Sequence, residues 1–277
     1  MDRDGDPRSL HRARVASRRL RELVPVLPLT PGTARKLNRR LRKITARLGA
    51  VRELDVLLLL IDELRESRRR HSDALARVAV AVARDRDRSR GRRPKRVPVD
   101  DLRRMARKLG DLADDLEGAS PRAAKATRWA VEARVARRAE RLAEALRDAS
   151  AVYLPERLHD VRIAVKKLRY SIELGRSVGT RTDPAALRAL KRVQDALGRM
   201  RDMQVLIDRV RQVQATLTPP NVAVWRSLDA LVASLDDDCR RLHARFMRLR
   251  PELDKIGERE SPKPGTRHSA PGARRVG

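Results

Sequence analysis

The sequence predicts an all-α protein built from two related helical lobes. Charged residues make up 37% of the 277-residue chain, whereas aromatic residues make up only 2%. Ala, Leu and Val dominate the apolar set, so good helix formers are plentiful and large aromatic anchors are scarce. The second observation is an internal repeat, in which residues 10–21 return as residues 158–169. We therefore expect two lobes related by a pseudo-twofold axis.

The repeat consists of two matched segments in the same order. Residues 10–21 read LHRARVASRRLR and return 148 residues later as LHDVRIAVKKLR. Residues 41–53, LRKITARLGAVRE, return at an offset of 149 as LKRVQDALGRMRD at residues 190–202. Agreement in order and in offset indicates an internal duplication.

Proline, glycine and capping signals divide the chain into helices. Thr30 before Pro31 and Ser120 before Pro121 are typical helix starts, whereas Gly49 is expected to mark a break or a bend. The apolar run 56–61 favours a buried helix over a strand because helical patterns flank it. We expect helices over about 9–26, 30–49, 53–69, 72–90, 100–117, 120–149, 155–177, 184–198, 201–216 and 220–250.

These helices group into two lobes and a tail. The repeats assign residues 1–150 to an N-terminal lobe and residues 151–257 to a C-terminal lobe. Residues 258–277 are polar and rich in proline and glycine, which is typical of a disordered tail. We expect the few aromatic residues to pack in the core or between the lobes.

The net charge of +29 indicates a polyanionic partner, because a bound anion would relieve the repulsion among clustered cations. Cys239 is the only cysteine, which excludes an intrachain disulfide and a cysteine metal cluster. A single Glu-x-x-His unit, Glu156 to His159, is too little for a di-iron site, and we expect no metal or cofactor. With no apolar span or signal core in the sequence, we expect a cytoplasmic protein without membrane contact.

The histidine of each repeated segment begins a stripe of basic residues. At about 100° per residue, the cations three, seven and ten positions after it lie on one side of the helix, beside an apolar face. Charge runs are ordinarily solvated helix faces, but few acids are interleaved here, which favours an anion-binding surface. This segment provides the candidates His11, Arg14, Arg18, Arg19, Arg21, His159, Arg162, Lys166, Lys167 and Arg169.

The second segment adds three cations in each copy, and the histidines add a pH hypothesis. These cations are Arg39, Arg42 and Lys43, with the counterparts Arg188, Lys191 and Arg192. A protonated imidazole donates two hydrogen bonds to phosphate oxygens and a neutral one donates one. Binding would then strengthen at mildly acid pH.

The His-x-x-Arg-x-x-x-basic-basic-Leu-Arg helix, followed by Leu-Gly-x-x-Arg-Asp/Glu and present twice, resembles the CHAD family, the conserved histidine α-helical domain. The resemblance extends over roughly residues 8–250, and residues 158–170 match best. It implies two four-helix bundles around a basic central groove that binds inorganic polyphosphate, lined by the histidines and stripe cations. The sequence departs from the family pattern at Gln204, where an acid like Asp55 is favoured.

The sequence thus predicts non-catalytic polyphosphate binding, with polyphosphate granules and polyphosphate-metabolising enzymes as candidate associations. Arg forks and Lys point charges suffice to recognise a chain of phosphates. Non-specific nucleic-acid binding is the alternative, but aromatic residues for base stacking are few. The Glu-x-Glu-x-Lys motif of triphosphate-processing tunnel enzymes, which often accompany this family, is absent. We therefore expect no enzymatic activity.

Overall fold

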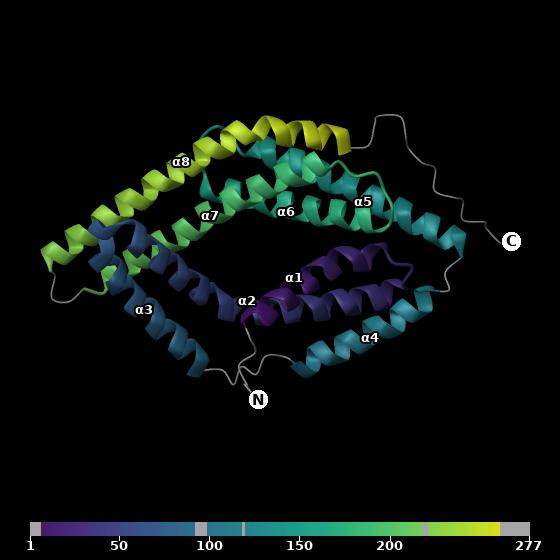
Figure 1. The fold of residues 1–277 in the computed structure, drawn as a ribbon, viewed down its shortest axis with the longest axis horizontal. Coiled ribbons are helices and arrows are strands. Elements are labelled where there is room, and N and C mark those ends of the chain that lie inside the picture. The colour runs from purple at the N-terminus through teal and green to yellow at the C-terminus, as the bar shows by residue number, and fades with distance from the viewer. Residues whose placement is uncertain (1–6, 92–98, 118–119, 218–220, 261–277) are drawn as a thin grey trace.

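The computed structural model describes residues 7–91, 99–117, 120–217 and 221–260, and this part of the chain is helical without any strand (Figure 1). The prediction of an all-α fold is confirmed. The helices are α1 (Pro7–Leu23), α2 (Pro31–Ser67), α3 (Ser72–Gly91), α4 (Val99–Glu117), α5 (Pro121–Asp148), α6 (Pro155–Ser177), α7 (Pro184–Ala215) and α8 (Val222–Glu260), with the 3-10 turns η1 (Val24–Val26) and η2 (Arg69–His71).

Helix starts follow the signals in the sequence. The hydroxyl of Thr30 accepts a hydrogen bond from the backbone N–H of Thr33, and Ser120 caps α5 through Ala123 in the same way. A proline stands in the first turn of both helices, where its missing N–H costs no hydrogen bond. Local chemistry therefore fixes where these helices begin.

Three predicted helix ends are wrong. Helix α2 continues through Gly49 and α7 continues through Gly198, so each is one helix where two were expected. A glycine inside a helix costs only about 1 kcal/mol, and buried apolar side chains on both sides of each glycine offset that cost. Helix α8 runs through Pro251 to Glu260, held by the buried Leu253 and Ile256. The predicted tail at 258–277 is therefore helical over 258–260, and the remainder of it lies outside the described residues.

The buried apolar residues form two clusters of unequal size. The smaller cluster joins η1, the first half of α2 and α4 through Val24, Leu37, Leu41, Ile44 and Met105, with side chains of α1 packed against it. The larger cluster joins the second half of α2 with α3 and α5–α8. Helices α3 and α5, which the sequence assigned to the first lobe, thus share a core with the second. The division into two four-helix bundles stays a prediction.

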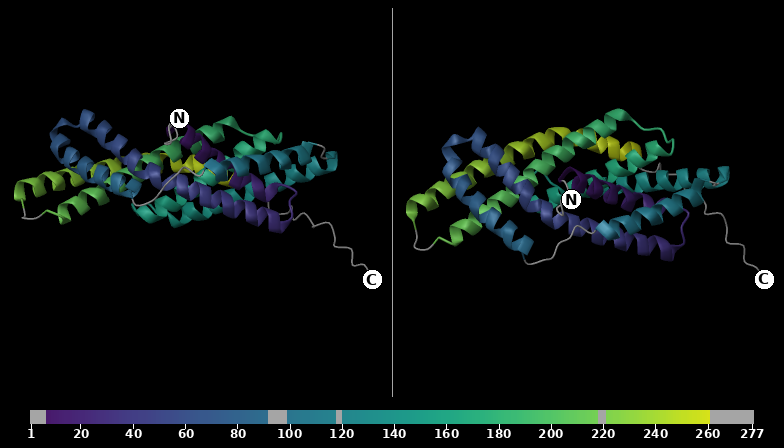
Figure 2. Two further views of the ribbon diagram at one scale, coloured as in Figure 1. Left: turned by 90° about the horizontal axis from the view of Figure 1, so that it is seen from below. Right: turned by 60° about the horizontal axis from the view of Figure 1, so that its bottom comes forward.

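Helix α1 is the element that brings the two clusters together. It packs against both α2 and α6 and is drawn between them in Figure 1, and Figure 2 shows the same helices from two other directions. At its end the buried Glu22 accepts hydrogen bonds from Arg134 and Arg138 of α5. One face of α1 therefore belongs to the smaller cluster and another to the helices of the larger one.

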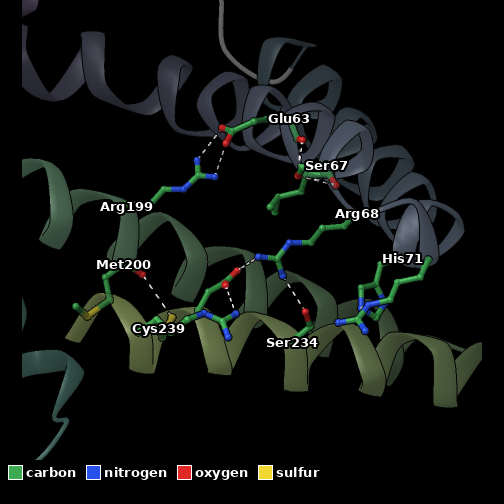
Figure 3. Close-up of polar contacts among 12 residues, drawn as sticks. Glu63, Ser67, Arg68, His71, Arg199, Met200, Ser234 and Cys239 are labelled. Carbon is green, nitrogen blue, oxygen red and sulfur yellow. Dashed lines mark hydrogen bonds and ion pairs between the residues drawn. The ribbon is translucent and has the colours of Figure 1, made fainter. Parts of the chain in front are cut away.

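Helix α2 is tied to α7 and α8 by polar contacts at its far end (Figure 3). Glu63 accepts two hydrogen bonds from Arg199, at 2.8 and 2.6 Å. Arg68 donates to the hydroxyl of Ser234 and pairs with Asp238. These contacts fix the turn between α2 and α3 against α8.

The aromatic residues only partly follow the expectation of core packing. Phe246 and Tyr170 are buried. Trp129 and Trp225 are exposed, at 54% and 49% of their surface. The expectation is wrong for both tryptophans, whose rings lie on the surface of α5 and α8.

Candidate functional site

The two repeated basic stripes face one another across the contact between α1 and α6. Arg14 and Arg18 of α1 and Arg162 and Arg169 of α6 exert the strongest electrostatic effects on Lys166. Arg14 and Arg18 occupy the same repeat positions as Arg162 and Lys166. We call these five residues, Arg14, Arg18, Arg162, Lys166 and Arg169, the α1–α6 cluster.

Lys166 lies at the centre of the α1–α6 cluster and is only partly exposed. Its pKa is lowered to about 7, firstly by burial and then by the four surrounding guanidinium groups. Burial disfavours the charged amine, and each neighbouring cation disfavours it further. The cluster is therefore a region of strong positive potential that is partly shielded from water.

Arg162 extends the α1–α6 cluster towards α7. Burial lowers its pKa, and Asp202 of α7 is the main charge that opposes this shift. Its Nε is buried without a hydrogen-bond partner, and a Cβ added to Gly198 would lie 3.9 Å from that atom. The guanidinium of Arg162 therefore lies next to α7 at Gly198, with an unused donor at Nε.

His159 lies at the same end of the α1–α6 cluster. Burial lowers its pKa, and Arg201 and Arg162 lower it further. Its Nδ1 is buried and has no hydrogen-bond partner. A neutral imidazole can still donate one hydrogen bond to a ligand oxygen. The side chain of His11, its repeat counterpart, lies outside the described residues.

Comparison with known proteins identifies the family of the chain. The model of the family described as CHAD domain matches residues 1–211, which include α1, α6 and most of α7. The chain belongs to the CHAD family. Among solved structures, the crystal structure of the CHAD domain from the plant Ricinus communis is similar, with 25% sequence identity and a TM-score of 0.51. The match covers 86% of this chain and 82% of that one. No curated protein matches the chain.

In this CHAD chain the second cation of each adjacent pair lies away from Lys166: Lys167 lies near Glu22 and Arg21, whereas Arg19 pairs with Glu173. Arg138, Glu22, Arg141 and Arg21 are the charges that act on Lys167, whose pKa is lowered mainly by burial. Arg19 pairs with Glu173, which also pairs with Arg169 at 3.1 Å. The family motif's two adjacent cations therefore diverge, and only the first of each pair joins the α1–α6 cluster.

The second repeated segment of the CHAD domain contributes differently from what the sequence suggests. Lys191 pairs with Asp195 at 2.7 Å, and Arg192 pairs with Glu252 of α8 at 2.6 Å. The other predicted cations of this segment are exposed, and no described interaction joins them to the α1–α6 cluster: Arg39, Arg42, Lys43 and Arg188. The structure does not bring these six residues together with the repeated stripes.

Arg201 is a basic residue near the α1–α6 cluster that was not predicted from the sequence. It acts electrostatically on both His159 and Arg162. The sequence does single out this residue, because Arg201 is the arginine of the repeated Leu-Gly-x-x-Arg-Asp motif. The acid that follows it, Asp202, has a pKa raised mainly by burial, and Glu53 from the other copy of the motif raises it further. The two copies of this motif therefore also meet.

Gln204, the departure from the CHAD pattern, has a defined partner. Its Nε2 donates a hydrogen bond of 2.7 Å to the hydroxyl of Tyr153.

The described residues contain no group of three or more His, Cys, Asp or Glu side chains placed to hold a metal ion. None of the described helices is long and apolar enough to cross a membrane.

Proposed function

We propose that this protein binds inorganic polyphosphate without catalysis, through the α1–α6 cluster. The observation that carries the proposal is the convergence of five cations from two helices onto a partly buried surface, with Lys166 surrounded by guanidinium groups. Such a cluster opposes folding unless an anion compensates it. Its concentration at one helix contact therefore favours a binding role over an ordinary solvated surface.

The chemistry of the α1–α6 cluster suits a chain of phosphates. A linear polyphosphate carries closely spaced charges and acceptor oxygens, which arginine forks and a lysine ammonium satisfy without any base recognition. The Nε of Arg162 and the Nδ1 of His159 are buried near these cations, and neither atom has a hydrogen-bond partner. Membership of the CHAD family, which is associated with polyphosphate binding in general, supports the same ligand.

The cellular role that we propose follows from the ligand. A non-catalytic domain of this kind would hold the protein at polyphosphate granules in the cytoplasm, or next to enzymes that make or degrade polyphosphate. The net charge of +29 also favours nucleic acid as a second candidate ligand, because backbone phosphates attract the same cations. Neither exposed tryptophan belongs to α1 or α6, so the cluster helices present no tryptophan on which bases could stack.

The test is a titration of the purified protein with long-chain polyphosphate at physiological salt. Alanine replaces Arg14, Arg18, Arg162 and Lys166 together, which should weaken binding on the order of 100-fold or more. A matched control removes three arginines and one lysine that are exposed elsewhere on α2, α3 and α8, namely Arg65, Arg77, Arg226 and Lys255. It carries the same net charge as the first variant and should retain binding.

The outcomes separate the candidate functions. Loss of binding in the cluster variant alone, with resistance to competition by duplex DNA, supports the proposed site. Equal losses in both variants would mean that net charge alone attracts the ligand. Equal displacement by duplex DNA would favour the nucleic-acid candidate.

A further inference from the structure

Lys166 differs from the other cations of the α1–α6 cluster in the charges that surround it. Arg162 has Asp202 of α7 nearby, and Arg169 is paired with Glu173. Lys166 is partly buried where α1 packs on α6. The charges that act most strongly on it are all positive: Arg14 and Arg18 of α1, and Arg162 and Arg169 of its own helix. The cations of α5 that face this part of α6, Arg138 and Arg141, act on the adjacent Lys167. Glu22 of α1 also acts on Lys167, but among the described residues no acid is one of the charges that act most strongly on Lys166.

Only one basic group of the α1–α6 cluster can discharge at physiological pH. Guanidinium groups stay protonated in proteins, so the four arginines keep their charge. A lysine amine loses its proton when burial and like charges act on it. The pKa of Lys166 is about 7 in the structure without ligand, so the empty site holds the amine mainly in its neutral form above that pH.

We propose that polyanion binding to the α1–α6 cluster is coupled to the uptake of one proton by Lys166. The empty site then carries a neutral amine, and the occupied site carries an ammonium that pairs with phosphate oxygens. The amine nitrogen takes its proton from the solvent or buffer, and no other bond forms or breaks. This inference rests on the proposed function and adds a proton to its binding reaction.

The coupling has a defined sign. A bound polyanion favours the charged amine and returns its pKa towards the ordinary lysine value of about 10.4. Between pH 7 and about 10.4, the ordinary lysine pKa, binding of the polyanion therefore includes protonation of Lys166. Over this range the affinity should fall as pH rises, by at most about tenfold per pH unit. Below pH 7 the amine is already charged in the empty site, and the dependence on Lys166 disappears.

His159 is a further titratable group near this region, and Arg201, Arg162 and Lys166 all lower its pKa. A histidine could also take up a proton when an anion binds. Its contribution is small at pH 8.5, roughly two units above the ordinary histidine pKa of about 6.5. Lys166 is expected to be neutral in the empty site at that pH, so the experiment is best placed there.

Calorimetric titration of the full chain with long-chain polyphosphate at pH 8.5, in two buffers of different ionisation enthalpy, measures the proton directly. The wild type should take up about one proton for each occupied site. Lys166→Arg should bind with almost none, because the arginine is charged before the ligand arrives. Lys255→Arg, an exposed lysine of α8, should behave like the wild type.

Competitive acetylation of the free protein across pH gives a second measurement that needs no ligand. Lys166 should become reactive around pH 7, well below Lys255. Tight binding with heat that is independent of buffer, or reactivity of Lys166 only near pH 10, would refute the proton coupling and leave the proposed function standing. Absence of polyphosphate binding would refute the proposed function and, with it, the coupling.

Discussion

Glu22 is the buried carboxylate that joins α1 to the helices of the larger apolar cluster, and its removal should destabilise the fold strongly. The residue is 8% exposed. Arg134 donates to it through Nη2 at 2.6 Å and Nε at 3.1 Å, and Arg138 donates through Nη2 at 3.0 Å. Burial lowers the pKa of Arg134, Glu22 opposes this shift, and the neighbouring Arg138 lowers the pKa further, so Glu22 does not fully compensate this guanidinium even in the intact protein.

The size of the effect follows from burial. Removing one partner of a buried ion pair costs about 3–5 kcal/mol, because the other partner stays buried without compensation. The side chains of Arg134 and Arg138 keep 12% and 18% of their exposure, which places Glu22→Ala near the lower end, about 3 kcal/mol. For a domain of ordinary stability, about 5–15 kcal/mol, this is a large share.

Urea unfolding followed by helical circular dichroism measures this cost. The matched control is Glu63→Ala, because Glu63 also accepts two hydrogen bonds from one arginine, Arg199. Its side chain is 59% exposed, so the pair should contribute only about 0–1 kcal/mol. Equal losses in the two variants would refute the argument from burial, and so would a cost for Glu22→Ala below about 0.5 kcal/mol.

Two further predictions concern Lys166 and the helical glycines. Burial lowers the pKa of Lys166, so its protonation opposes folding below about pH 7, and this penalty disappears as pH rises towards the unfolded value. Lys166→Met should therefore stabilise the free protein by roughly 2–4 kcal/mol at pH 6 and by about half of that at pH 9. A gain in stability that is the same at both pH values would contradict the lowered pKa of Lys166. Gly175→Ala should lower the free energy of unfolding, measured by thermal unfolding, by about 1–3 kcal/mol because the new Cβ collides with Thr180 Oγ1. Gly198→Ala should raise it by up to about 1 kcal/mol, because the nearest neighbour of the new Cβ is Arg162 Nε at 3.9 Å. Equal signs for the two glycines would refute the local geometry.

Helix starts and the faces of the first repeated segment could be predicted because both depend on nearby residues. Thr30 and Ser120 cap their helices through the backbone three residues away. Arg14 and Lys166 lie on their predicted faces because the helical period alone sets the direction of a side chain. Local interactions of this kind are fully contained in a short stretch of sequence.

Predictions failed where distant residues decide the outcome. Helix α8 continues past Pro251 because Leu253 and Ile256 are buried against other helices, which no local signal reports. Arg192 was expected to join the stripe cations, but it pairs with Glu252, sixty residues away in the chain, and its role in anion binding stays a prediction. A helical wheel shows which face a cation occupies and leaves open whether a carboxylate from another helix meets it there. The same limit concealed Arg201, whose importance lies in its position near His159 and Arg162.

The unequal size of the two apolar clusters has a consequence for local unfolding. The smaller cluster buries few side chains, so α1 and α4 should open more readily than the helices of the larger cluster, and their amides should exchange with solvent faster. Arg14 and Arg18 leave the site whenever α1 opens. Only the closed fraction of molecules can then bind a polyanion, and the measured affinity falls in proportion to that fraction. A polyanion bound to the α1–α6 cluster, as proposed, should in turn slow amide exchange in α1.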